Sequence, residues 1–173
     1  MTNPMTYSQT IALDAMGGDY GPDVIVPGAA QALEKIPGTK FIFFGDEKKI
    51  APVLAKYVAL KNVSEIHHTE KKISSADGIS AAIRASKDSS MRLAIEAVKE
   101  GRAGSVVSAG NTGALMALSK MILKTLPGIE RPAIASLLPN ANGSSVMLDL
   151  AANLECDAEV LVQFALLGAT YAR

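Results

Sequence analysis

Short apolar runs alternate with stretches of helical periodicity along most of this chain, and this alternation restricts the fold more than any other feature. Strands are predicted at 11–13, 40–44, 63–68 and 105–108, and helices at 22–36, 47–57, 89–101 and 114–123. Strands that alternate with helices form βαβ units with right-handed crossovers. The sequence therefore predicts an α/β fold in which helices cover both faces of a mostly parallel sheet.

The rest of the chain adds a short helix, a hairpin and a final helix. We expect a loop and a short helix over 74–88, and strands over 133–138 and 146–150 with the hairpin pair Asn142-Gly143 between them. Asp157 is placed to cap a helix that runs to Arg173. We expect residues 1–10 to be a flexible N-terminal tail and residues 11–173 to form a single α/β domain.

Charge and composition argue against several classes of protein. Lysine plus arginine and aspartate plus glutamate both number 17, so the formal net charge is zero, and tryptophan is absent. Nucleic-acid-binding proteins usually carry a basic surface and aromatic stacking residues, so we expect no nucleic-acid partner. The first ten residues lack the apolar core of a signal peptide, and no apolar run approaches the roughly 20 residues that span a bilayer. We expect a cytoplasmic protein.

A glycine turn follows the first predicted strand, where parallel α/β sheets bind ligands. It reads Asp14-Ala15-Met16-Gly17-Gly18-Asp19. The two glycines allow a close approach of the backbone to a ligand, and the carboxylates of Asp14 and Asp19 suit a hydroxyl, a cation or a backbone amide. A plain tight turn in which Asp19 acts as a cap explains the same residues.

A second glycine turn, Ser108-Ala109-Gly110-Asn111-Thr112-Gly113-Ala114, links the strand at 105–108 to a helix. Backbone N–H groups converge at a helix N-terminus and favour an anion there. Asn111 and Thr112 add side-chain donors. The spacing fits neither a P-loop nor the dinucleotide pattern GxGxxG. The alternative is that this segment is only a capped helix start.

Three further groups of polar residues are weaker candidates. Ser89 is placed to cap the helix at 89–101. Together with Lys87 and Ser90 it also suits a phosphate, although a solvated charged face is the simpler explanation of this group taken alone. Arg131 lies just before a predicted strand. Asp149 and Asn153 follow another predicted strand, where polar residues indicate either a binding site or a cap.

No metal site or nucleophile is indicated. His67 and His68 are adjacent in a predicted strand and point to opposite faces, so they do not share one ion. Cys156, the only cysteine, has no neighbouring base in the sequence and is expected to be inert.

Together these motifs resemble the PlsX-type phosphate acyltransferases of bacterial phospholipid synthesis. The resemblance rests on 14–19, 87–91, 108–114, 131–133 and 149–153, in this order. It implies a three-layer α/β/α sandwich similar to the isocitrate dehydrogenase and phosphotransacetylase folds, incomplete in this chain. It also implies transfer of an acyl group from acyl carrier protein to phosphate, without a metal or organic cofactor, by a homodimer loosely associated with the membrane.

For this chemistry we expect Lys87 and Asn111 to be catalytic. The residues expected to bind substrate are Asp14, Gly17, Gly18, Asp19, Ser89, Ser90, Ser108, Gly110, Thr112, Gly113, Arg131, Asp149 and Asn153. Family members are about twice as long as this chain and usually have glycine at the position of Ala152. Two alternatives stay open: an NAD(P)-dependent dehydrogenase of the isocitrate dehydrogenase fold, and a truncated, non-catalytic interaction remnant.

Overall fold

The computed structural model describes residues 9–74, 76, 78–150 and 155–172. The chain forms two compact units, Met1–Leu123 and Lys124–Arg173. The tail expected over 1–10 lies outside the described residues except for Gln9 and Thr10, and Thr10 already begins the first strand.

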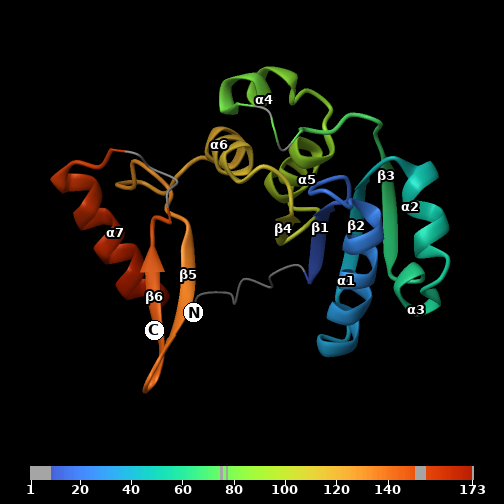
Figure 1. Cartoon of the computed structure of the whole chain (residues 1–173), viewed down its shortest axis with the longest axis horizontal. Coiled ribbons are helices and arrows are strands. Elements are labelled where there is room, and N and C mark those ends of the chain that lie inside the picture. The colour runs from blue at the N-terminus through green and yellow to red at the C-terminus, as the bar shows by residue number, and fades with distance from the viewer. Residues whose placement is uncertain (1–8, 75, 77, 151–154, 173) are drawn as a thin grey trace, which may run out of the picture. The chain divides into compact units, whose positions relative to one another are not determined.

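The first unit is built on a four-stranded parallel sheet (Figure 1). Its strands are β1 (Thr10–Asp14), β2 (Lys40–Gly45), β3 (Ser64–His68) and β4 (Ser105–Ser108). Their order in the sheet is β3-β2-β1-β4. The chain therefore adds β2 and β3 on one side of β1 and then crosses to the other side for β4. The point between β1 and β4, where the direction of winding reverses, is the position at which such sheets bind ligands.

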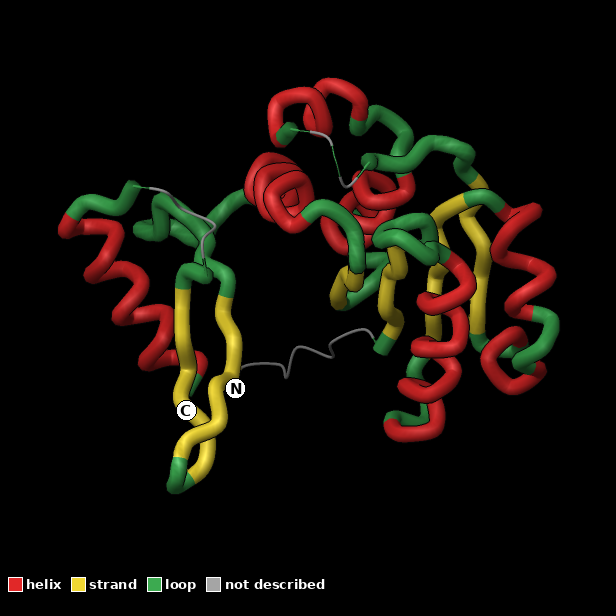
Figure 2. Tube along the Cα trace, viewed as in Figure 1, coloured by secondary structure: helices red, strands yellow, loops and turns green. Residues whose placement is uncertain are grey.

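Six helices connect these strands or follow them (Figure 2). They are α1 (Pro22–Lys35), α2 (Glu47–Leu54), α3 (Val58–Lys61), α4 (Ile79–Ala85), α5 (Ser90–Lys99) and α6 (Thr112–Leu123). The single helix expected over 47–57 was wrong in extent. The chain turns at 55–57 and restarts as α3, which brings Leu60 into the same buried cluster as Leu54.

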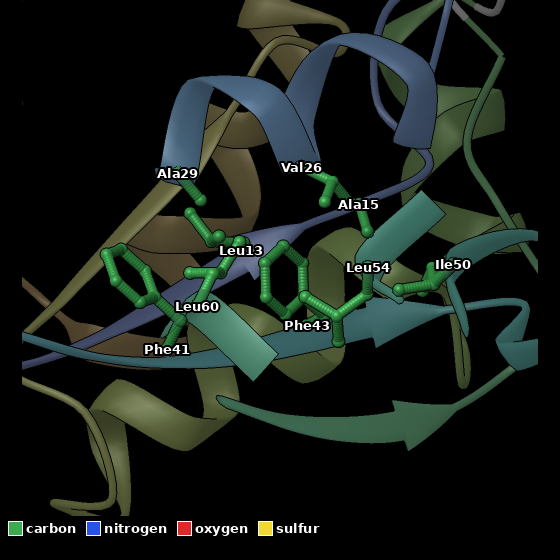
Figure 3. Packing of buried hydrophobic residues seen from close by; sticks show 9 residues of the cluster. All are labelled: Leu13, Ala15, Val26, Ala29, Phe41, Phe43, Ile50, Leu54 and Leu60. Carbon is green, nitrogen blue, oxygen red and sulfur yellow. The ribbon is translucent and has the colours of Figure 1, made fainter. Parts of the chain in front are cut away.

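The strands bury side chains on both faces, as a parallel sheet between two helical layers requires. Leu13, Phe41 and Phe43 pack with residues of α1, α2 and α3 (Figure 3). The alternate residues Ala12, Ile42 and Phe44 pack with Ala94 and Ala97 of α5. The predicted α/β fold with helices on both faces is confirmed, and the arrangement is consistent with a three-layer sandwich.

The second unit contains an antiparallel hairpin and one helix. The hairpin pairs β5 (Ala135–Asn140) with β6 (Gly143–Leu148), and α7 (Ala158–Tyr171) packs against β6. The predicted hairpin is confirmed, but its two-residue turn is Ala141-Asn142, one residue earlier than expected. Gly143 begins β6 with a φ of 140°. The Asp157 side chain caps α7 as predicted, because it accepts a hydrogen bond from the Val160 N–H at 2.9 Å.

Candidate functional site

The glycine turns after β1 and β4 lie against each other at the reversal point of the sheet. Asp14 and Ser108 are the last residues of these two strands and are partners in the parallel register. The Ser108 hydroxyl donates a hydrogen bond to Asp14 Oδ2 at 2.6 Å and accepts one from the Gly110 N–H at 3.0 Å. We call Asp14, Gly17, Gly18, Ser108 and Gly110, with the first turn of α6, the switch-point site.

The glycines in this site are required by close packing. A Cβ atom at Gly17 would lie 2.7 Å from Asp14 Oδ2 and 2.9 Å from the Gly110 nitrogen. Gly18 has a φ of 76°, and a Cβ there would lie 3.1 Å from the Ala109 carbonyl oxygen. The two turns are therefore in backbone-to-backbone contact, which any side chain would disturb.

Asp14 is a buried structural carboxylate in this arrangement. Its side chain is only 2% exposed, and its Oδ1 accepts a hydrogen bond of 3.4 Å from the Met16 N–H. Asp19, by contrast, is exposed. The structure thus separates the two carboxylates that the sequence placed together.

The first turn of α6 combines a side-chain cap with backbone donors. Asn111 Oδ1 accepts a hydrogen bond of 2.9 Å from the Ala114 N–H. Asn111 therefore caps α6, as the alternative interpretation of this segment predicts. The N–H groups of Thr112 and Gly113 have no acceptor among the residues that the structure describes. Such unpaired amides at a helix N-terminus carry partial positive charge and can bind an anion.

The start of α5 lies beside this turn. A Cβ atom at Gly110 would be 2.9 Å from Met91 Cε, so the second residue of α5 touches the turn after β4. Sequence reasoning missed Met91, because nothing local distinguishes it from any other core methionine. Ile79 of α4 was missed for the same reason, and its side chain closes over Gly113.

The residues around the start of α5 have different roles. Ser89 is fully buried and caps the helix, with its hydroxyl accepting a 3.3 Å hydrogen bond from the Arg92 N–H. Ser90 is 1% exposed, and its hydroxyl has no hydrogen-bond partner within the described parts of the chain. Lys87 is exposed in the turn between α4 and α5, and no described residue forms an ion pair with it.

The remaining candidates belong to the second unit. Arg131 Nη1 donates a hydrogen bond of 3.2 Å to the Glu155 carbonyl oxygen, and Arg131 Nε lies 3.7 Å from Glu130 Oε1. The Asp149 N–H donates a hydrogen bond of 2.8 Å to the Ile134 carbonyl oxygen. Asp149 has a φ of 61°. Asn153 lies outside the described residues.

Cys156 contacts one of these candidates. Its thiol lies 3.8 Å from Asp149 Oδ2. Partial burial, followed by the Asp149 carboxylate, holds the pKa of the Cys156 thiol above its ordinary value. The thiol therefore stays protonated at neutral pH, which argues against a role as nucleophile.

The two histidines have separate partners. The His67 ring lies 5.2 Å from the Phe44 ring, centroid to centroid, while His68 Nδ1 accepts a hydrogen bond from the Glu47 N–H at 3.1 Å. They occupy different environments, as their adjacent positions in β3 predict.

Comparison with known proteins gives consistent matches. The family described as fatty acid synthesis protein matches residues 9–173. A phosphate acyltransferase of Rhodospirillum centenum is 58% identical over 163 residues, which cover 94% of this chain and 46% of that protein. One of Rhodospirillum rubrum is 52% identical over 169 residues, covering 98% of this chain and 48% of that protein. The chain spans about half the length of the curated relatives it matches.

Proposed function

The chain belongs to the fatty acid synthesis protein family, and from that premise we propose that it forms part of an acyltransferase. The proposed reaction moves an acyl group from an acyl carrier protein thioester to inorganic phosphate and supplies phospholipid synthesis. The names of the relatives support this activity over the dehydrogenase alternative. No specific observation favours a second function.

The switch-point site carries the proposal. Its location between β1 and β4 is the usual ligand position in this kind of sheet. The Thr112 and Gly113 N–H groups supply donors without an acceptor among the described residues. Gly17, Gly18 and Gly110 let the turns after β1 and β4 pack closely at the start of α6. We place the phosphate at these donors, next to the Asn111 amide and the Thr112 hydroxyl.

The start of α5 extends the phosphate site. Met91 contacts Gly110, so Ser90 beside it lies at the same edge of the sheet. Because the buried Ser90 hydroxyl has no partner within the described residues, we include it as a phosphate ligand, whereas Ser89 holds the helix cap. In this proposal Lys87 adds a full positive charge to the partial charges of the helix amides.

In the proposed reaction phosphate is the nucleophile, so the protein needs no nucleophilic side chain. A phosphate oxygen attacks the thioester carbonyl carbon, and the carbonyl oxygen becomes a tetrahedral oxyanion. Its collapse breaks the carbon–sulfur bond and releases acyl-phosphate and a thiolate, which then takes a proton. Lys87 and the helix amides stabilise the negative charge, and the site holds phosphate and thioester in contact. The hydrogen bond between Asp14 and Ser108 holds the two turns in place.

We extend the proposal to partners and location. Acyl carrier protein is the proposed acyl donor, and the protein is proposed to act in the cytoplasm as a homodimer with peripheral contact to the membrane. No helix in the described part of the chain is long and apolar enough to cross a membrane. Exposed apolar residues on α7, among them Leu161, Val162 and Leu166, support self-association. Arg131, Asp149 and Asn153 stay proposed substrate contacts.

Two measurements on the 173-residue chain test the proposal. In a phosphate titration followed by NMR, the Thr112 and Gly113 amide signals should shift, while the amides of the exposed turn glycines Gly128 and Gly143 should not. Acyl-phosphate formation from acyl carrier protein and phosphate is then assayed as hydroxylamine-trapped product and as released thiol. Amide shifts without product would favour the non-catalytic alternative. The absence of both amide shifts and product would refute the phosphate site.

A further inference from the structure

The segment that follows β3 runs along the carboxyl edge of the sheet toward α5 (Figure 1). We call residues 69–73 the strap. At its start, Thr69 is buried, and the Thr69 N–H donates a hydrogen bond of 2.9 Å to the Gly45 carbonyl oxygen at the end of β2. At its end, Ile73 is buried in one cluster with Met91 of α5. Both ends of the strap are therefore fixed to the core of the first unit.

The strap lies against the tight turn that carries Lys87. The Ser89 N–H closes this turn with a 2.9 Å hydrogen bond to the Ser86 carbonyl oxygen, so Lys87 and Asp88 are its central residues. Ser86 and Ser89 are fully buried. Asp88 has a φ of 62°, at the position of the turn where glycine or asparagine is usual. A backbone in this left-handed region persists only where surrounding contacts hold it.

The strap supplies such contacts. The Thr69 hydroxyl donates a hydrogen bond of 2.6 Å to the Asp88 carbonyl oxygen and accepts one of 3.2 Å from the Lys71 N–H. Lys71 Nζ also lies 3.2 Å from Asp88 Oδ2, but both side chains are more than half exposed, so water screens this ion pair. The Ser90 N–H donates to the Lys71 carbonyl oxygen at 3.0 Å, which joins the strap to the start of α5. The Thr69 hydroxyl is therefore the stronger of these two contacts on Asp88.

We propose that Thr69 is a positioning residue for the phosphate site and acts through the turn that carries Lys87. The inference rests on the proposed function, because that function places phosphate beside Lys87. Thr69 binds the backbone of Asp88, the next residue, and has no contact with phosphate in this assignment. A lysine on a fixed turn loses less conformational freedom when it pairs with an anion, so a fixed turn binds phosphate more tightly. Thr69 lies outside every sequence motif that indicated the site.

The test is a double-mutant cycle on the 173-residue chain. Its readout is the affinity for inorganic phosphate, measured by NMR from the Thr112 and Gly113 amide shifts. Thr69→Val removes the hydroxyl without changing the charge and should weaken phosphate binding about twofold to tenfold, as the loss of one hydrogen bond predicts. Thr69→Ser keeps the donor and should bind as tightly as the unmodified chain. When Lys87→Ala is already present, Thr69→Val should change the affinity by less than about twofold.

Thr39→Val is the matched control. Thr39 is also buried, and its hydroxyl donates a hydrogen bond of 2.9 Å to the Ile36 carbonyl oxygen. It precedes β2, at the opposite edge of the sheet from the strap, so its loss should leave the affinity for phosphate unchanged. Equal losses of affinity in Thr39→Val and Thr69→Val would indicate general destabilisation and overturn the inference. A Thr69→Val effect of the same size with and without Lys87 would overturn it too.

A cysteine variant keeps the test decisive if valine prevents folding. The thiol of Thr69→Cys is a weaker donor than a hydroxyl, so its affinity for phosphate should fall below that of Thr69→Ser. Equal affinity of Thr69→Cys and Thr69→Ser would then overturn the inference. The absence of any phosphate-dependent shift in the unmodified chain would refute the proposed function and the positioning role with it. Phosphate binding that persists at full strength in a folded Thr69→Val would refute the positioning role alone.

Discussion

The Ser108 hydroxyl donates a 2.6 Å hydrogen bond to the Asp14 carboxylate, across 94 residues of sequence. It connects the last residues of two neighbouring parallel strands, at the point where the sheet reverses its winding direction. The same hydroxyl accepts the Gly110 N–H, so one side chain fixes both glycine turns. The geometry of the switch-point site depends on this contact.

Ser108→Ala should lower the free energy of unfolding by about 1–3 kcal/mol, because it removes the hydroxyl that hydrogen-bonds to the buried Asp14 Oδ2 and to the Gly110 N–H. Urea denaturation followed by circular dichroism measures the change. Ser105→Ala, at the exposed opposite end of β4, is the control and should stay within about 0.5 kcal/mol of the unmodified chain. Equal stability of the two variants would show that the Asp14–Ser108 contact contributes nothing.

Gly17→Ala should destabilise the fold by about 1–3 kcal/mol, because the new methyl group would lie 2.7 Å from Asp14 Oδ2 and force the two turns apart. Gly28 in α1 is the matched control, since a Cβ atom there meets nothing within 4 Å. Gly28→Ala should stabilise the helix by about 0.5–1 kcal/mol. Thermal unfolding of both variants checks the prediction, and a change of the same sign in both would contradict it.

Lys87→Ala should reduce the rate of acyl-phosphate formation about tenfold to a thousandfold, as expected when one electrostatic stabiliser of the transition state is removed. Its melting temperature should barely change, because Lys87 is exposed and forms no ion pair with a described residue. Lys99→Ala removes the same charge from the opposite end of α5 and should leave the rate unchanged. Unchanged kinetics for Lys87→Ala would remove this lysine from the site.

The Cys156 thiol should react with iodoacetamide along a pH profile whose midpoint lies above that of a free cysteine, because burial and the Asp149 carboxylate raise its pKa. Asp149→Asn should lower this midpoint. A pKa raised by folding means that the thiol's contribution to stability is present below the unfolded pKa and is lost as pH rises through the folded pKa. An alkylation midpoint below the ordinary cysteine value would contradict the assigned environment.

The chain should self-associate at micromolar concentration, because Leu161, Val162 and Leu166 on α7 are 57%, 61% and 61% exposed. Light scattering should give a mass above that of the monomer. Leu161→Glu/Leu166→Glu should shift the mass to the monomer, while Ala141→Glu in the exposed hairpin turn should not. A monomer at all concentrations would refute the role of this surface.

The sequence by itself determined the elements of this protein and their local ends. Alternating apolar runs predicted each parallel strand, and both faces of β1 and β2 are buried as such runs require. Ser89 and Asp157 were predicted as caps and accept the corresponding N–H groups. Helix caps and apolar periodicity involve residues within about four positions of each other, so the local sequence is enough to predict them.

Only the tertiary structure decided which elements meet. The sequence placed Asp14 and Ser108 at strand ends but did not show that β4 pairs with β1, and therefore did not predict their hydrogen bond. It grouped Asp14 with Asp19, which the fold separates into a buried carboxylate and an exposed one. Contacts such as Met91 with Gly110, and Thr69 with Asp88, depend on the order of strands in the sheet. That order is set by long-range packing, which no short stretch of the sequence encodes.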